Sequence, residues 1–266
     1  MMDSQYLWRL AIKICGALVL FFLIAPILAI IPLSFNSSSI LSYPLEGFST
    51  EWYAKLFVDD RWWNAIRNSL IVAAATVAIA TPLGTFAAVG LSKVTFRGKP
   101  LVVAALMSPM IVPTIITAVG IYFMFSKLGL ANSLTGLVLA HVALAVPFVV
   151  ITVSASVAQL DPVLLRAASS LGAGAVTSFR VVTLPLILPG VISGAIFAFT
   201  TSFDEVVVAV LLTGPEQRTL PRELLSGTRE NLDPSVMAIA TLLVLFSTAL
   251  LLVFNAIQNR SRKLRD

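Results

Sequence analysis

The adjacent carboxylates Asp204 and Glu205 could do chemistry because they stand at the end of a long apolar run. Charged groups are costly within lipid, so they tend to face a cavity, a partner or the aqueous interface. One hypothesis is that both carboxylates line a cation path and attract an ammonium group. The alternative is an interfacial turn, or an ion pair with Arg67 or with a second subunit.

Other side chains that could bind a ligand or take part in a reaction are isolated along the chain. His141 is the one histidine, which makes a metal site unconvincing, so we expect it to form a hydrogen bond between helices. Tyr122 adjoins Phe123, where it could either meet a ligand chain or pack against its neighbours. The sequence has no His-Glu-x-x-His motif, no Gly-x-Ser-x-Gly motif and no Gly-rich phosphate loop with its Lys. This argues against an intramembrane enzyme, and any energy from ATP must come through another polypeptide.

Residues 160–183 contain interspersed polar residues and separate two apolar runs. Asp161-Pro162 is a favourable helix start, because Asp caps free N–H groups and Pro suits the first helical position. The following spacing of apolar residues predicts one stripe on a short helix, and Gly172 can end that helix in a left-handed conformation. A second short helix would carry Val176 and Phe179. We expect a compact two-helix knob, with an amphipathic connector on the lipid surface as the alternative. The predicted stripe consists of Leu160, Leu164, Ala168 and Leu171.

The elements around this segment are long apolar runs, in a chain of 266 residues that is 58% hydrophobic and only 12% charged. Runs of about 20 apolar residues match the thickness of a bilayer core, where each must be helical to satisfy its backbone groups. The sequence therefore predicts an all-α membrane protein with six transmembrane helices in one domain, residues 1–266. The predicted spans are Ala11–Leu33, Ser69–Leu91, Leu101–Phe125, Leu134–Val157, Leu184–Phe203 and Val236–Ile257.

Proline and glycine modify these spans. Pro113 and Pro189 lie inside two of the predicted helices, where proline removes a hydrogen bond and bends the helix. The pattern Gly190-x-x-x-Gly194 permits another helix to approach closely. We therefore expect bent helices and one tight helix–helix contact.

The distribution of basic residues predicts the orientation in the membrane. The loops on one side carry a clear positive excess, whereas the opposite loops are net negative. The positive-inside rule then places both termini and residues 160–183 in the cytoplasm. The net charge of +5 thus reflects topology, and we do not interpret it as nucleic-acid binding. The basic residues on the inner side are Arg9, Lys13, Lys93, Arg97, Lys99, Arg166, Arg180, Arg260, Arg262, Lys263 and Arg265.

At the knob the sequence resembles the permeases of bacterial ABC importers. Their EAA loop reads Glu-Ala-Ala, three residues, Gly, nine residues, then Ile-x-Leu-Pro, and this chain matches it in register, with Val182 at the Ile position. Arg166 stands where the family usually has Glu, which reverses the charge there. The resemblance covers roughly the whole chain and looks closest to the spermidine/putrescine-type branch. The residues in register are Ala167, Ala168, Gly172, Leu184 and Pro185, and the branch is indicated by residues 202–208 and by Thr213-Gly214-Pro215.

The resemblance implies the type I ABC importer permease fold and a role for each candidate residue. The loop would be the coupling helix that seats in a cleft of a cytoplasmic ATPase. The implied ATPase-coupling residues are Leu164, Arg166, Ala167, Ala168, Leu171, Gly172 and Pro185. The implied translocation path contains Tyr122, Ser202, Asp204 and Glu205.

The resemblance also implies partners and a location. The chain would be an inner-membrane permease that forms half of a pathway for a polyamine or a related cationic amine. Its partners would be an ATPase dimer, a second and unlike permease, a periplasmic substrate-binding protein and membrane lipid. No cofactor would bind to this chain, because ATP–Mg would sit on the ATPase. The alternatives are a permease for an amino acid, GABA or an opine-like solute, and an ion-driven carrier or channel.

Overall fold

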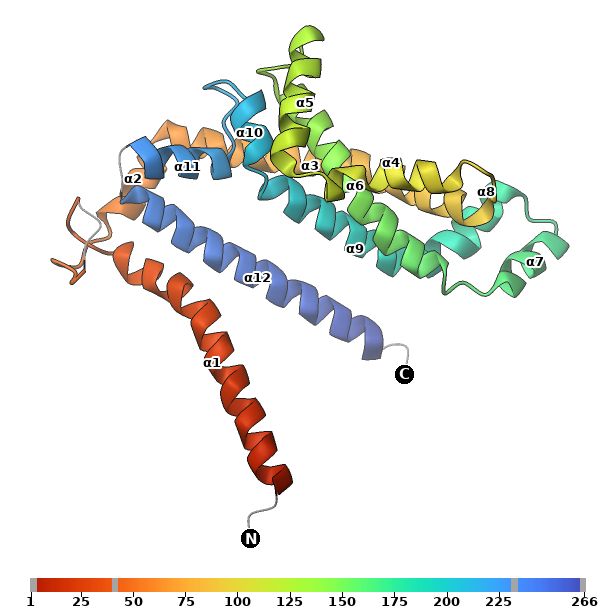
Figure 1. Ribbon diagram of the computed structural model, residues 1–266, viewed down its shortest axis with the longest axis horizontal. Helices are drawn as coiled ribbons and strands as arrows, with labels where there is room; N and C mark the ends of the chain where they lie inside the picture. Colours follow the sequence, from red (N-terminus) through yellow and green to blue (C-terminus); the bar gives the residue numbers. More distant parts are fainter. Residues whose placement is uncertain (1–3, 40–42, 231–233, 264–266) are drawn as a thin grey trace. The chain divides into compact units, whose positions relative to one another are not determined.

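The computed structural model describes residues 4–39, 43–230 and 234–263, and within these ranges the regular structure is entirely helical (Figure 1). Asp3, Asp233, Arg265 and Asp266 therefore lie outside the described residues. The chain divides into two compact units, residues 1–63 with 224–266 and residues 64–223. The helices are α1 (Ser4–Leu33), α2 (Glu51–Val58), α3 (Asp60–Lys93), α4 (Lys99–Ile111), α5 (Thr114–Lys127), α6 (Leu134–Val157), α7 (Pro162–Ser170), α8 (Ala175–Ser178), a π-helical turn (Phe179–Thr183), α9 (Leu184–Phe203), α10 (Val207–Leu212), α11 (Leu220–Glu230) and α12 (Ser235–Lys263).

The first unit contains α1, α2 and α12. The apolar window of α1 exposes its side chains all round, as expected of a helix whose surroundings are lipid or another apolar surface. In α2 the side chains of Trp52 and Leu56 are buried. The Trp52 indole Nε1 donates to the Asn36 carbonyl at 2.7 Å, which joins α2 to the segment after α1.

The second unit is built around the tightly packed pair α6 and α9. Glycine permits this approach, because a Cβ atom on Gly190 would lie only 2.2 Å from the Ser156 Oγ. A Cβ on Gly194 would lie 2.8 Å from the Thr152 Oγ1. The tight contact predicted from the Gly190-x-x-x-Gly194 pattern is therefore confirmed.

The predicted third span, Leu101–Phe125, is wrong as a continuous helix. The structure has two helices, α4 and α5, whose axes differ by 106°. Pro113 explains the break: a residue before proline is pushed towards extended backbone, and Val112 has φ −75° and ψ 133°. A bend was expected here, but proline at this position ends α4 and starts a separate helix in another direction.

Four single helices among the described residues are long and apolar enough to cross a membrane, and the pair α4–α5 makes up to five if counted as one span. The predicted runs Leu134–Val157 and Leu184–Phe203 coincide with α6 and α9. The last predicted run lies within α12, of which Ser235–Ala249 is found as a shorter apolar helix. The fold is therefore that of an all-helical membrane protein.

Candidate functional site

The ends of α7 are fixed by local hydrogen bonds. At its start the Asp161 carboxylate accepts from the Val163 N–H at 2.8 Å, and Pro162 occupies the first turn. At its end Gly172 has φ +80°, a region that strains any residue with a Cβ. The Ala173 N–H donates to the Ala168 carbonyl and the Gly172 N–H to that of Ser169, both at 3.0 Å. These two bonds form a Schellman cap, so both predicted helix boundaries are confirmed.

The apolar stripe of α7 is uncovered. Leu164 is 45% exposed and Leu171 is 89% exposed, and Val176 on α8 is exposed as well. Leu160 departs from the predicted stripe because it packs against the core together with Phe179. Leu160 and Phe179 thus anchor the two ends of a projection whose outer apolar side chains have no partner among the residues described.

The chain returns from this projection without a break. α8, the π-helical turn and α9 run on as one helix from Ala175 to Phe203, whereas a separate second helix was expected. In the turn the Leu184 N–H donates to the Phe179 carbonyl, five residues back. Pro185 follows directly and has no N–H to offer to the preceding turn. The wider turn keeps the helix intact where proline would otherwise interrupt it, and the Phe86 and Phe179 rings, 5.7 Å apart, join it to α3.

The candidate coupling residues therefore lie on one continuous segment of the second unit, from α7 to the first turn of α9. Arg166 and Ala167 are exposed on α7, Ala168 is half-buried, and Gly172 forms the cap. Pro185 lies in the first turn of α9 and is also exposed. The structure thus places six of these residues on α7 and its cap, and Pro185 on α9.

The two carboxylates of the candidate path have different environments. One oxygen of Glu205, Oε1, accepts from the N–H groups of Val207 and Val208 at 2.8 and 3.0 Å, so it caps α10. Asp204 follows the end of α9 and is exposed. Neither carboxylate forms an ion pair with Arg67 among the residues described. Asp204 is therefore the carboxylate that can meet a cation without first losing a bond.

Ser202 lies in a buried polar cluster between three helices. The His141 Nδ1 on α6 is 2.8 Å from the Ser202 Oγ on α9, and this hydroxyl is 3.3 Å from the Thr76 Oγ1 on α3. The predicted helix–helix hydrogen bond of His141 is thus confirmed. Ser202 is 5% exposed, so its place is beneath the surface on which Asp204 lies.

Tyr122 is separate from that cluster. It is 38% exposed on α5, and its ring meets the Phe123 ring edge-on, with centroids 5.8 Å apart. α5 itself packs against α10, and the Asn132 N–H after α5 donates to the Leu212 carbonyl at 2.8 Å. Tyr122 therefore lies on α5, and Glu205 lies just before α10, the short helix that α5 contacts.

Sequence reasoning missed a polar clamp around Thr213 and Gly214. The Arg222 guanidinium donates to the Thr213 carbonyl and hydroxyl and, at 3.2 Å, to the Gly214 carbonyl. Burial lowers the pKa of Arg222, the positive charge of Arg218 lowers it further, and Glu223 opposes this. The signal available was the density of charge in this segment, but charge density alone does not show which carbonyls an Arg will reach.

The same clamp is fastened to α3. The Asn68 side chain donates to the carbonyls of Glu216 and Arg218 at 2.9 and 3.1 Å, and the Ser69 hydroxyl accepts from the Leu220 N–H at 2.8 Å. The Glu223 carboxylate is almost fully buried and pairs with Arg218 at 3.1 Å. The segment after α10 is therefore held in one conformation by side chains that are distant in sequence.

A protein-family comparison bears on this arrangement. Residues 80–263 match the family described as binding-protein-dependent transport system inner membrane component. The chain belongs to this family. It is accordingly a multi-pass inner-membrane transport component.

Named relatives match over most of the chain. The spermidine/putrescine transport system permease protein PotC of Escherichia coli K12 is 35% identical over 242 residues, which cover 91% of each chain. The putrescine transport system permease protein PotI of the same organism is 36% identical over 244 residues, covering 89% of this chain and 85% of the relative. These identities confirm the permease family and the branch that the motifs indicated.

A solved structure agrees on the fold. The chain is similar to a bacterial ABC transporter that imports the acidic polysaccharide alginate, with a TM-score of 0.77, 15% identity and 97% of each chain covered. At this identity the likeness concerns the fold alone, which is that of a type I ABC importer permease.

Proposed function

We propose that this chain imports polyamines such as putrescine or spermidine, or a related small cationic amine, as one half of a translocation pathway. The observation that carries the substrate class is the identity of about a third, over nine-tenths of the chain, to permeases named for spermidine and putrescine. Asp204 supports it chemically, because an exposed carboxylate at the end of α9 can attract an ammonium group.

In this proposal α7 transmits the motion of a separate ATPase. The helix is short, capped at both ends and presents Leu164 and Leu171 outward, which suits a rigid knob that fills an apolar cleft. Binding of ATP–Mg would close an ATPase dimer, and the displacement would pass through Phe179 and the continuous helix into α9. The chain itself would bind no nucleotide and no other cofactor.

The pathway would be completed by other polypeptides. A second, unlike permease would form the other half of the pore, and a periplasmic substrate-binding protein would deliver the amine. We assign six spans to one permease domain, residues 1–266, with α4 and α5 acting together as the third. Both termini and residues 160–183 would lie in the cytoplasm, as the positive-inside rule requires.

Uptake measurements test the substrate class. The complete transporter, reconstituted with its own receptor and ATPase, should accumulate labelled putrescine or spermidine only when ATP is inside the vesicles. A vesicle preparation without the receptor is the control. Accumulation of GABA, another amino acid or an opine-like solute in place of polyamines would contradict the substrate class. Uptake that continues without ATP would instead identify an ion-driven carrier or channel.

A further inference from the structure

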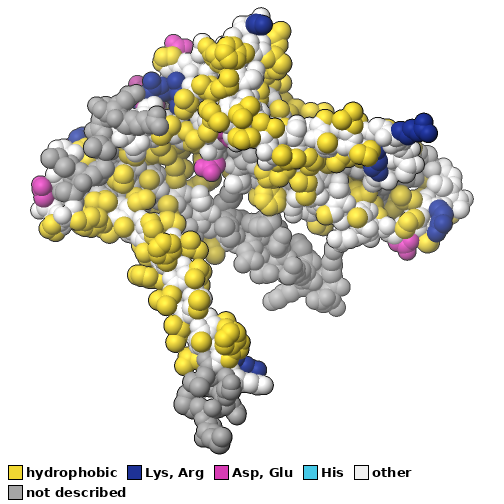
Figure 2. Space-filling view, viewed as in Figure 1, with side chains coloured by type: hydrophobic (Ala, Val, Ile, Leu, Met, Phe, Trp, Pro, Cys, Tyr) yellow, Lys and Arg dark blue, Asp and Glu magenta, His cyan; other side chains and the backbone are white. Residues whose placement is uncertain are grey.

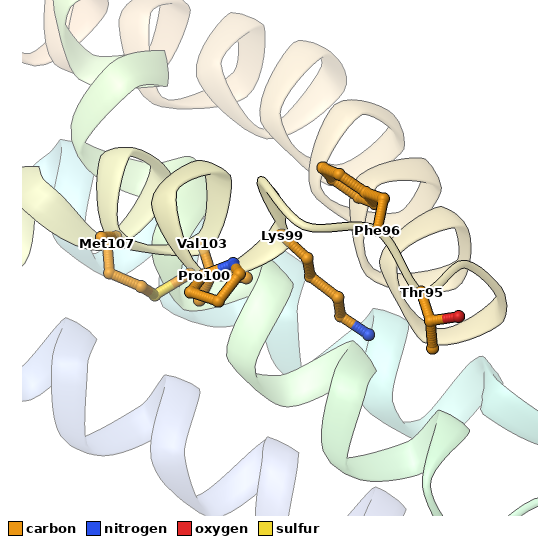
Figure 3. Close-up of a pocket in the computed structure, with 7 residues that line it drawn as sticks. Thr95, Phe96, Lys99, Pro100, Val103 and Met107 are labelled. Atoms are coloured by element: carbon orange, nitrogen blue, oxygen red, sulfur yellow. The ribbon is translucent and has the colours of Figure 1, made fainter.

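A pocket lies where α3 ends and α4 begins, outside the residues assigned to coupling or to the path. Its volume is about 630 Å³, which is within the usual range for ligand pockets. The wall is apolar and lies on one face of α4, where Pro100, Val103 and Met107 recur at helical spacing (Figure 3). Lys99 stands at the start of that face and is half-buried.

Lys99 lines this pocket, and two further basic residues lie within six positions of it in the chain. Lys93 ends α3 and Arg97 lies in the turn before Lys99, and both are exposed. None of the three forms an ion pair among the residues that the structure describes. Figure 2 shows Lys and Arg side chains gathered at the end of the second unit where α7 and the start of α4 lie. Residues 93–99 therefore carry three positive charges and no acidic residue.

The combination of a cationic rim and an apolar wall matches one kind of molecule. A phospholipid carries its anionic phosphate next to apolar chains, and basic pockets between membrane helices on the cytoplasmic side bind such head groups. α4 buries none of its side chains, so its apolar face has room for an acyl chain. Lys and Arg near a membrane surface also extend their charged ends towards the head groups.

We propose that this pocket binds an anionic phospholipid of the inner leaflet, with its phosphate at Lys93, Arg97 and Lys99 and an acyl chain along Pro100, Val103 and Met107. The inference rests on the proposed function only for the side of the membrane, since residues 93–99 and α7 lie at the same end of the second unit. The bound lipid would support the corner from which α7 projects, because the Phe86–Phe179 contact links α3 to the turn before α9.

Lipid retention by the purified transporter complex tests this proposal. Native mass spectrometry would count phosphatidylglycerol and phosphatidylcholine that stay bound after transfer from mixed-lipid nanodiscs. We expect a preference for phosphatidylglycerol. Lys99→Gln should weaken it about fivefold, and K93Q, R97Q and K99Q together about a hundredfold, since each basic residue contributes about 1 kcal/mol near an anionic surface. Lys127→Gln, an exposed charge at the end of α5, is the matched control and should change nothing.

A second variant tests the apolar part of the site. Ala104→Trp fills the pocket while leaving all three charges in place, and it should abolish retention of the lipid. Equal retention of both lipids by the wild type, or unchanged retention by the triple variant or by Ala104→Trp, would overturn the proposal. So would a crosslink from residue 104 to the second permease in place of lipid. Retention is measured without substrate, so a failure of polyamine uptake would leave this result intact and count only against the proposed function.

Discussion

Arg166 is exposed on α7 and has no acidic partner among the residues described, so its charge is available to whatever docks on the helix. The family usually has Glu at this position, and an importer that carries Arg should have a matching acidic group on its own ATPase. Val163 lies three residues earlier on the same face of α7 and is 51% exposed, so a protein that docks against Arg166 would also bury apolar area.

We predict that Arg166→Glu weakens ATPase binding about tenfold, a cost of about 1.4 kcal/mol for one reversed charge. Titration of the permease with labelled ATPase measures this. Arg180→Glu is the control, because Arg180 is exposed in the same segment but lies on the π-helical turn. If Arg166→Glu binds the ATPase as the wild type does, the matched-charge hypothesis fails.

Asp204 and Glu205 should behave differently although they are neighbours. We predict that Asp204→Asn raises the KM for polyamine uptake about tenfold, since a charge-assisted hydrogen bond contributes about 1.5–3 kcal/mol. Glu205→Gln should have a smaller effect, because an amide oxygen can still accept from the N–H groups of Val207 and Val208. Uptake kinetics decide the matter, and an unchanged KM in both variants would remove the carboxylates from the path.

At the scale of elements, the contact of α6 with α9 depends on the absence of side-chain atoms. We predict that Gly190→Ala destabilises the complex by about 1–3 kcal/mol, because its Cβ would collide with Ser156. Gly90→Ala is the matched control: Gly90 is also helical, has no atom within 4 Å of the added Cβ, and alanine favours the helix. Thermal unfolding in detergent compares them, and equal melting temperatures would contradict a close approach at Gly190.

The cap of α7 offers a more local test. Gly172→Ala should cost about 1–2 kcal/mol because alanine resists the left-handed conformation, while Gly174→Ala should be tolerated at φ −68°. The expected consequence is weaker coupling. ATP hydrolysis continues, but fewer substrate molecules are transported for each ATP that is hydrolysed. The ratio of uptake to hydrolysis measures this, and an unchanged ratio in Gly172→Ala would show that the cap is dispensable.

At the scale of the whole molecule, orientation can be tested by labelling. In a variant without Cys15, a cysteine introduced at Ser170 on α7 should react with an impermeant maleimide only after the membrane is opened. A cysteine at Thr50, just before α2, should react in intact spheroplasts. The positive-inside rule predicts these opposite outcomes, and a reversed pattern would place α7 out of reach of any cytoplasmic ATPase.

Much of the architecture could be predicted because helix boundaries are local. The limits of α6 and α9 follow from apolar length, and those of α7 from Asp161, Pro162 and Gly172. Pro113 predicts a bend. The angle of that bend depends on the packing of α5 against α10, which no local pattern encodes. The same applies to the π-helical turn, which depends on where Pro185 falls relative to a helix already held by Phe179.

The candidate sites were predictable only in part. The candidate coupling residues follow a fixed spacing, and the structure has all of them except Pro185 on α7 or its cap. The bonds of Ser202 with His141 and Thr76 join positions 61 and 126 residues away, and such pairs cannot be inferred from one sequence. The contact of Arg222 with Thr213 could not be predicted for another reason: its acceptors include backbone carbonyls, which every residue possesses.

The hydrogen bond between Asn132 and Leu212 has a mechanical consequence. It links the turn that follows α5 to the last residue of α10, and the two helices also pack against each other. α5 begins after Pro113, and α10 begins after the short connection 204–206. A displacement of either helix would therefore be transmitted to the other. We therefore expect α5 and α10 to move as one pair when the pathway changes its accessibility, and a crosslink that holds either helix in place should hold both.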